Sequence, residues 1–342
     1  MNFKEKIKKY DNSNLRENIL NCYKQFGIGI KIAEKIKLKK RKFDKIIIAG
    51  MGGSAWPGDI IYTYLDLKKQ IKIPIIIDRN YFLPNQVTKN SLIFISSYSG
   101  NTEEALSVYK EALKKKLIMT GFCVGKKLEK MCLKDKIPFV KYPDDGPSFQ
   151  PRFATGYTFS SMLTVLANLR IIQNQSKDIL RLEKFLKKII PCLENQGKQL
   201  AQKLFNKIPL IYSPDEFKII ARTWTIKFTE NSKMLAFWNY FPELNHNEMN
   251  GYVNAKGKNF FTIILKSNIS HSRVIKRAEI TAQMIKEKGG EVEILNMLGK
   301  NILEKMFSSI ILGDWTSYYL SLLNNQDPTP VKMVEEFKKR ME

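Results

Sequence analysis

Apolar runs alternate with helix-compatible stretches through the first half of the chain. Short runs rich in β-branched residues occupy residues 45–50, 73–77, 92–96, 118–124 and 138–141, and segments with helical spacing of apolar residues separate most of them. Strands that alternate with helices in this way form parallel sheets covered by helices. The pattern therefore predicts an α/β domain in this half of the chain.

The alternation stops near the middle of the chain and then returns. The segment YPDDGPSFQPR, residues 142–152, contains three prolines and one glycine, which is typical of turns. A long helical stretch to about Lys207 follows. Strand patterns then recur in IPLIYS, NFFTIIL and GGEVEIL, with a helix expected near 215–229 and further helices to Glu342. Because a chain of 342 residues exceeds the usual size of a single core, we predict two α/β domains, residues 1–150 and 151–342.

The composition narrows the class of protein. No apolar run approaches the ~20 residues that span a bilayer, and the lysine-rich N-terminus lacks the apolar core of a signal peptide. We therefore expect a soluble cytoplasmic protein with no membrane partner. The four cysteines form no C-x-x-C pair and have no metal-binding spacing with histidine, which predicts neither a disulfide framework nor a zinc site.

The formal net charge of +24 raises the question of nucleic-acid binding. The lysines are scattered over most helical segments, as in KEKIKKY and KEALKKKL, without interleaved aromatic residues. This distribution favours a solvated lysine-rich surface, so we expect no nucleic-acid partner. The charge would still help to steer anionic substrates toward the protein.

The stretch IIIAGMGGSAWPGDI, residues 46–60, predicts a strand, a tight glycine turn and a helix. The first backbone N–H groups of a helix have no intrahelical partner, so such a turn is an anion site. Gly53 and the hydroxyl of Ser54 at the start of the helix suit a compact phosphate monoester, which accepts hydrogen bonds from backbone and side chain alike.

Two other interpretations of the glycine turn stay open. Gly50, Gly52 and Ala55 satisfy a relaxed dinucleotide fingerprint, and Asp78 closes the next apolar strand, where a ribose-binding carboxylate could lie. The turn could also serve only to let strand and helix pack closely.

The stretch IFISSYSGNTEEAL, residues 93–106, repeats the order of strand, loop and helix. Gly100 and Asn101 permit a tight loop, and Glu103 and Glu104 suit a first helical turn. Hydroxyl side chains in such a place can be simple helix caps. Here they follow the same edge of the same predicted sheet as Ser54, which favours a phosphate-binding cradle. The hydroxyl side chains are those of Ser96, Ser97, Ser99 and Thr102.

The motifs GMGGSA and SYSGNTEEAL resemble the sugar isomerase, or SIS, domain. GPSFQPRFATGY, FTENSKMLAFWNYFPELNHNEMNGY and DPTPVKMVEEFKKRME resemble the bifunctional phosphoglucose/phosphomannose isomerase family of archaea and bacteria, and the similarity spans nearly the whole chain. Trp56 and Pro57 depart from the smaller residues usual after Ser54. The resemblance implies two SIS-type domains, the first with phosphate-binding loops and the second with catalytic residues.

The resemblance also implies a reaction, the interconversion of glucose 6-phosphate and mannose 6-phosphate with fructose 6-phosphate through a cis-enediol. Glu230, in FTENSK, would carry the proton between C2 and C1, and His246, in PELNHNE, would exchange a proton with the ring oxygen. Arg152 would stabilise the enediolate, and Lys338 would assist ring opening, with Lys332 as the alternative. Two structural alternatives stay open: Glu230 could be a glutamate on the surface of a helix, and Arg152 could form a structural salt bridge.

The remaining implications concern ligands and partners. No metal and no cofactor is expected, because base, acid and cation all come from the protein. The sugar phosphate is the expected partner, together with a second subunit in a homodimer with a shared active site, to which the neighbour donates His246. The residues implied to bind the substrate are Gly53, Ser54, Ser97, Ser99 and Thr102.

Three further interpretations concern specificity and alternatives. Glucose and mannose 6-phosphates lead to the same enediol, and small residues around Thr329 and Val331 would leave room for rotation about the C2–C3 bond. His271, in SNISHSR, is predicted to be a loop or helix-cap residue. A sugar-phosphate sensor without catalysis and a nicotinamide-dependent oxidoreductase are the rival functions, although a sensor would not need Glu230, His246 and Arg152 together.

Overall fold

The computed structural model describes residues 2–254 and 256–341. The chain forms two compact units, one made of Asn21–Phe185 and the other of Met1–Leu20 with Leu186–Glu342. We call them the first and the second unit. The helix α8 (Ser176–Leu204) crosses the division between them, as does α2 (Leu15–Asn21). None of the helices in the described part of the chain is both long enough and apolar enough to cross a membrane.

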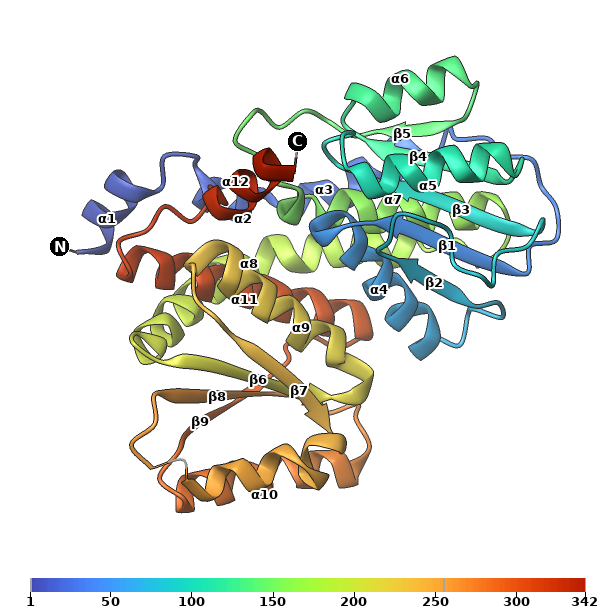
Figure 1. The fold of residues 1–342 in the computed structure, drawn as a ribbon. Helices are drawn as coiled ribbons and strands as arrows, with labels where there is room; N and C mark the ends of the chain where they lie inside the picture. Colours follow the sequence, from blue (N-terminus) through green and yellow to red (C-terminus); the bar gives the residue numbers. More distant parts are fainter. Residues whose placement is uncertain (1, 255, 342) are drawn as a thin grey trace. The chain divides into compact units, whose positions relative to one another are not determined.

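The first unit is built on a parallel sheet of five strands in the order β2-β1-β3-β4-β5 (Figure 1). All five strands predicted in this half of the chain are confirmed, with ends that differ by one or two residues. Their bounds are β1 (Lys45–Gly50), β2 (Ile75–Asp78), β3 (Ser91–Ser96), β4 (Ile118–Cys123) and β5 (Phe139–Lys141).

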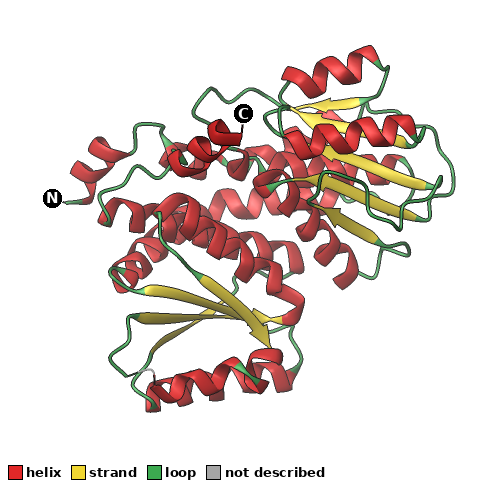
Figure 2. Cartoon of the chain, viewed as in Figure 1, coloured by secondary structure: helices red, strands yellow, loops and turns green. Residues whose placement is uncertain are grey.

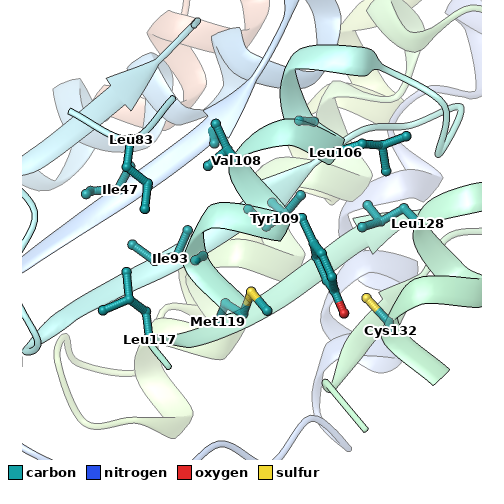
Figure 3. Close-up of a cluster of buried hydrophobic side chains, with 14 of the residues drawn as sticks. Ile47, Leu83, Ile93, Leu106, Val108, Tyr109, Leu117, Met119, Leu128 and Cys132 are labelled. Carbon is teal, nitrogen blue, oxygen red and sulfur yellow. The ribbon is translucent and has the colours of Figure 1, made fainter. Parts of the chain in front are cut away.

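Helices cover both faces of this sheet. The α5 and α6 side holds a core in which Ile47 and Ile93 of the strands meet Val108 and Tyr109 of α5 (Figure 3). On the opposite face α4 comes so close that a Cβ on Gly58 would lie 2.8 Å from the side chain of Ile77. The helices of the unit are α3 (Lys24–Ala33), α4 (Gly52–Leu67), α5 (Glu103–Lys114), α6 (Lys126–Lys134) and α7 (Thr155–Asn168), with a 3₁₀ turn η1 (Pro151–Phe153) before α7.

The predicted domain boundary at residue 150 differs from the division in the structure. The helix α7 packs along α3, and the Gln25 side chain of α3 donates to the Phe153 carbonyl (2.8 Å) and accepts from the Gly156 N–H (3.0 Å). Residues 151–185 therefore belong to the first unit. The sequence did not reveal this boundary because it depends on contacts between segments more than a hundred residues apart.

The second unit has a parallel sheet of four strands in the order β7-β6-β8-β9 (Figure 1). Figure 2 shows its strands in yellow and its helices in red. Three of the strands lie in the predicted segments, whereas β7, an edge strand whose side chains show no alternating burial, was not predicted. The strands are β6 (Ile208–Pro214), β7 (Phe237–Phe241), β8 (Phe260–Lys266) and β9 (Glu291–Asn296). The helices are α1 (Phe3–Tyr10), α9 (Lys218–Lys227), α10 (Ser272–Glu287), α11 (Ile302–Leu323) and α12 (Lys332–Met341), with the 3₁₀ turn η2 (Asp215–Phe217) before α9.

The first residues of the chain also lie outside their predicted domain. The Tyr318 hydroxyl of α11 donates to the Asp11 carboxylate (2.9 Å), and Arg16 pairs with Glu194 of α8 (2.8 Å). These contacts tie residues 1–20 to the second unit.

Candidate active site

The two predicted anion loops lie side by side in the first unit. They follow β1 and β3, which are neighbours in the sheet, so both emerge at its carboxyl edge. The Ser54 hydroxyl accepts a hydrogen bond from the Tyr98 N–H (2.9 Å), and the Ser96 hydroxyl donates to the Ser54 carbonyl (2.7 Å). The sequence-predicted convergence of Ser54 with the second loop is confirmed.

The hydroxyl groups of the second loop bond to one another. Ser97 Oγ donates to Thr102 Oγ1 (2.8 Å), and the Thr102 N–H donates to Ser97 Oγ (3.3 Å). Thr102 is the N-cap residue of α5, but its side chain makes no capping bond. Ser99 is partly exposed, and its hydroxyl accepts from the Asn101 N–H (3.3 Å). The hydroxyl group of Thr102 therefore does not act as a simple N-cap of α5.

Backbone geometry at the second loop requires glycine. Gly100 has a φ of +70°, and a Cβ there would overlap the Gly125 carbonyl oxygen. The α5 helix then begins with Glu103 and Glu104, as predicted. Since α4 and α5 both start at these loops, their positive dipole ends favour an anion at the carboxyl edge of the sheet.

Arg152 lies against the glycine turn. A Cβ on Gly53 would lie 2.5 Å from the Arg152 backbone nitrogen, and Arg152 is only 1% exposed. Its guanidinium lies 4.5 Å from the ring centroid of Phe153. The backbone of the buried Arg152 is therefore in direct contact with the turn that carries Gly53 and Ser54.

Two further residues border the glycine turn. The unusual Trp56 is buried, and its Nε1 donates to Thr155 Oγ1 of α7 (3.1 Å). Asp78 ends β2 and pairs in register with Ala49 of β1. Burial raises the pKa of the Asp78 carboxyl to about 6, and the nearby Glu111 adds to the shift.

Glu230 lies in the second unit, on the π-helical turn η3 (Phe228–Ser232) that follows α9. Its neighbours Phe228, Asn231 and Ser232 are buried, whereas Glu230 itself is partly exposed. π-Helical turns are rare, and those inside α-helices are frequently found at functional sites. The predicted helix near 215–229 is thus confirmed, with a wider last turn that exposes the carboxylate.

His246 ends the 3₁₀ turn η4 (Glu243–His246) and is exposed. Two residues later, Glu248 at the start of η5 (Glu248–Asn254) accepts hydrogen bonds from the Tyr212 hydroxyl and from Asn239 Nδ2. Burial, Tyr252 and the bond to Glu248 raise the pKa of the Tyr212 phenol, which keeps it a donor. Glu248 therefore ties the histidine loop to β6 and β7. The sequence analysis did not identify Glu248 as a functional residue, although it is the last residue of the segment PELNHNE that contains His246.

The C-terminal lysines lie on α12, where Lys332 and Lys338 are both exposed. The structure does not distinguish between them. The segment before α12 is linked to the Glu230 turn, because Lys233 Nζ donates to the carbonyls of Glu230 (2.6 Å) and Pro328 (3.1 Å). Thr329, expected to border the sugar, is buried.

The predicted site residues are thus divided between the units. The first unit holds the phosphate-type loops and Arg152, and the second holds Glu230, His246 and Lys338. Within the second unit Glu230 precedes the start of β7 and His246 follows its end. His271 is a helix cap, as predicted, because its Nδ1 accepts from the Arg273 N–H (3.2 Å).

Comparisons with known proteins show which proteins the chain is similar to. Residues 193–341 match the family described as the bacterial phospho-glucose isomerase C-terminal SIS domain. The chain is 36% identical to a bifunctional phosphoglucose/phosphomannose isomerase of Caldicellulosiruptor bescii, covering 96% of this chain and 97% of that protein. It is 31% identical to the protein of the same name from Aquifex aeolicus, covering 86% and 90%.

Solved structures show the same fold at much lower sequence identity. The C-terminal domain of glucosamine-fructose-6-phosphate aminotransferase from Francisella tularensis superimposes with a TM-score of 0.73 at 15% identity, covering 92% of this chain and 97% of that chain. The fold is therefore an SIS-type α/β fold with parallel sheets flanked by helices.

Proposed function

This chain belongs to the bifunctional phosphoglucose/phosphomannose isomerase family, and on that premise we propose that it interconverts glucose 6-phosphate and mannose 6-phosphate with fructose 6-phosphate. The observation that carries the proposal is the 36% identity over 96% of the chain to a protein named for both activities. The sensor alternative is not favoured, because the curated relatives that cover most of the chain are named as enzymes. The two parallel sheets, each flanked by helices, support two SIS-type domains.

The substrate phosphate is assigned to the two loops of the first unit. Gly53, Ser54, Ser97, Ser99 and Thr102 offer hydroxyl and backbone donors at the start of two helices, a favourable setting for a dianion. Because such sugar phosphates carry two charges, they do not pass freely through a bilayer. This chemistry supports a cytoplasmic enzyme.

The proton transfer is assigned to the Glu230 carboxylate. It takes the proton from C2 of the open-chain aldose, which leaves a cis-enediolate with the negative charge on O1. The hydroxyl proton of O2 moves to O1, and the Glu230 carboxyl returns its proton to C1, which gives the ketose with its carbonyl at C2. The negative charge of the enediolate is stabilised by the Arg152 guanidinium. His246 exchanges a proton with the ring oxygen as the ring opens and closes, assisted by the ammonium of Lys338.

A homodimer with a shared active site is part of the proposal. Glu230 and His246 lie on either side of β7 in the chain, and a strand of five residues spans about 15 Å. On the resemblance to the isomerase family, we assign the histidine of each site to the second subunit.

The activity is tested with the purified chain and each aldose 6-phosphate, with fructose 6-phosphate formation followed by a coupled assay. Turnover of both substrates is expected, with a rate unchanged by EDTA because base, acid and cation are protein groups in this mechanism. The proposed function would be refuted if the chain failed to turn over glucose 6-phosphate or failed to turn over mannose 6-phosphate. Loss of activity in EDTA with recovery on zinc would contradict the mechanism.

A further inference from the structure

The turn that carries Glu230 is fixed to α11 by the two residues that follow it. Asn231 Nδ2 donates to Ser317 Oγ (3.0 Å), and Ser232 Oγ donates to the Ser317 carbonyl (2.7 Å). Asn231 and Ser317 are fully buried, and Ser232 is 1% exposed. A single residue of α11 thus holds two consecutive side chains of the π-turn.

The hydrogen bonds at Ser317 have a fixed direction. The Ser317 hydroxyl donates to the Asp314 carbonyl one turn earlier (3.0 Å), so its oxygen is left to accept from the Asn231 amide. In this buried place an amide donor without its acceptor is costly, which disfavours other orientations of Asn231.

The residue before the turn is held by the same part of α11. Lys227, the last residue of α9, pairs with the Asp314 carboxylate (2.6 Å), and its side chain is 2% exposed. The π-turn is therefore attached at both ends to residues 314–317 of α11. Glu230 extends from this fixed turn into a partly exposed position, next to the exposed Thr229.

We infer that Asn231 and Ser317 are positioning residues for the Glu230 carboxylate. The inference rests on the proposed role of Glu230 as the base. A proton-transfer group must be held close to its target geometry, and a displacement of about 1 Å can reduce the rate by about 10²-fold. The π-helical turn is a rare backbone form, and the side-chain bonds of Asn231 and Ser232 to Ser317 attach it to α11.

The test compares Ser317→Ala with Ser321→Ala. Both serines are fully buried in α11, and each donates to the carbonyl three residues earlier, Ser321 to that of Tyr318 (2.7 Å). They differ in that Ser317 accepts from the Glu230 turn. We expect Ser317→Ala to lower kcat about 10- to 100-fold with KM changed less than about twofold. Ser321→Ala should keep both constants within about twofold of the parent.

A double-mutant cycle tests whether the bond itself is responsible. If Asn231 and Ser317 act through one hydrogen bond, Asn231→Ala combined with Ser317→Ala should lower kcat no further than the more impaired single variant. Multiplied losses would overturn the inference. Should Ser317→Ala fail to fold, Asn231→Ala removes the same hydrogen bond from the side of the π-turn and leaves α11 unchanged, and a parental kcat in that variant would also overturn the inference.

Glu230→Gln distinguishes the two possible failures. If this variant keeps parental turnover, the proposed base is wrong and the positioning role falls with it. If Glu230→Gln is inactive while Ser317→Ala and Ser321→Ala retain equal turnover, the base assignment stands and the positioning inference is refuted.

Discussion

A Cβ atom on Gly53 would lie 2.5 Å from the backbone nitrogen of Arg152 and 2.7 Å from its Cα. The glycine turn and the residue proposed to stabilise the enediolate are therefore in direct backbone contact. A side chain at position 53 would displace either the glycine turn or the Arg152 backbone. A change at the proposed phosphate-binding turn would therefore also shift the proposed cation.

Gly53→Ala is expected to impair binding and chemistry together. The added methyl group moves either the turn or Arg152, so KM should rise and kcat should fall, each by about tenfold or more. Overpacking of this kind also costs about 1–3 kcal/mol of stability. Steady-state kinetics at a temperature where the variant remains folded measure the effect. Parental kinetics would mean that the turn and Arg152 do not act on the same substrate.

Removing two hydroxyls of the second loop tests the phosphate assignment. Ser97→Ala combined with Ser99→Ala deletes two donors, each worth about 1.5–3 kcal/mol toward a charged group, so KM should rise at least about tenfold. Ser91→Ala is the matched control. This buried serine lies at the amino end of β3, the strand that precedes the second loop, and its hydroxyl accepts a hydrogen bond from the Thr88 N–H (2.9 Å). Equal KM values for the two variants would contradict the assignment.

Asp78 gives the first unit a pH-dependent stability. Its pKa is about 6 in the folded chain, above the value of about 4 expected when unfolded, so the folded state binds this proton more tightly. The free energy of unfolding should therefore fall as pH rises from about 4 to about 6 and stay at the lower level above that range.

Asp78→Asn removes this titration. Relative to the parent, the variant should gain about 1–3 kcal/mol of stability between pH 4 and pH 7, measured by denaturant unfolding at each pH. A difference between variant and parent that does not change with pH would show that Asp78 titrates normally.

The sequence predicted the first unit well for a physical reason. Its strands are short and apolar, and β1, β3 and β4 are almost fully buried, so they are recognisable from the local pattern, as in Lys45–Gly50. Strand β7 is half exposed at a sheet edge and has no such pattern. The domain limits depend on Gln25 and Asp11, whose partners are far away along the chain.

The candidate site, like the fold, was predictable from the sequence only in part. Ser54 and the second loop could be found because each follows a recognisable strand. Ser317 and Glu248 could not, because their importance lies in hydrogen bonds to Asn231 and Tyr212, and sequence spacing gives no sign of such pairs.

A shared active site predicts complementation between inactive chains. In a mixed dimer of Glu230→Gln and His246→Ala subunits, one of the two sites would combine an intact Glu230 with an intact His246 from the partner chain. Equilibrated mixtures should therefore regain activity that neither variant shows alone. Mixed dimers that remain inactive, with mixing verified by mass spectrometry, would show that the two residues act within one chain.

The division of labour between base and ring opening is tested with an open-chain hexose 6-phosphate analogue that cannot cyclise. Glu230→Gln keeps the size of the side chain and removes its basicity, so isomerisation should fall by about 10²–10⁴-fold or more. His246→Ala should impair mainly cyclic substrates, because the analogue does not need ring opening.

The most direct measurement is proton exchange between this analogue and deuterated water, followed by NMR in both variants. The His246→Ala enzyme is expected to incorporate deuterium at C1 or C2 at close to the parental rate, and the Glu230→Gln enzyme to incorporate none above background. Parental exchange in Glu230→Gln would contradict the central claim that this carboxylate moves the proton.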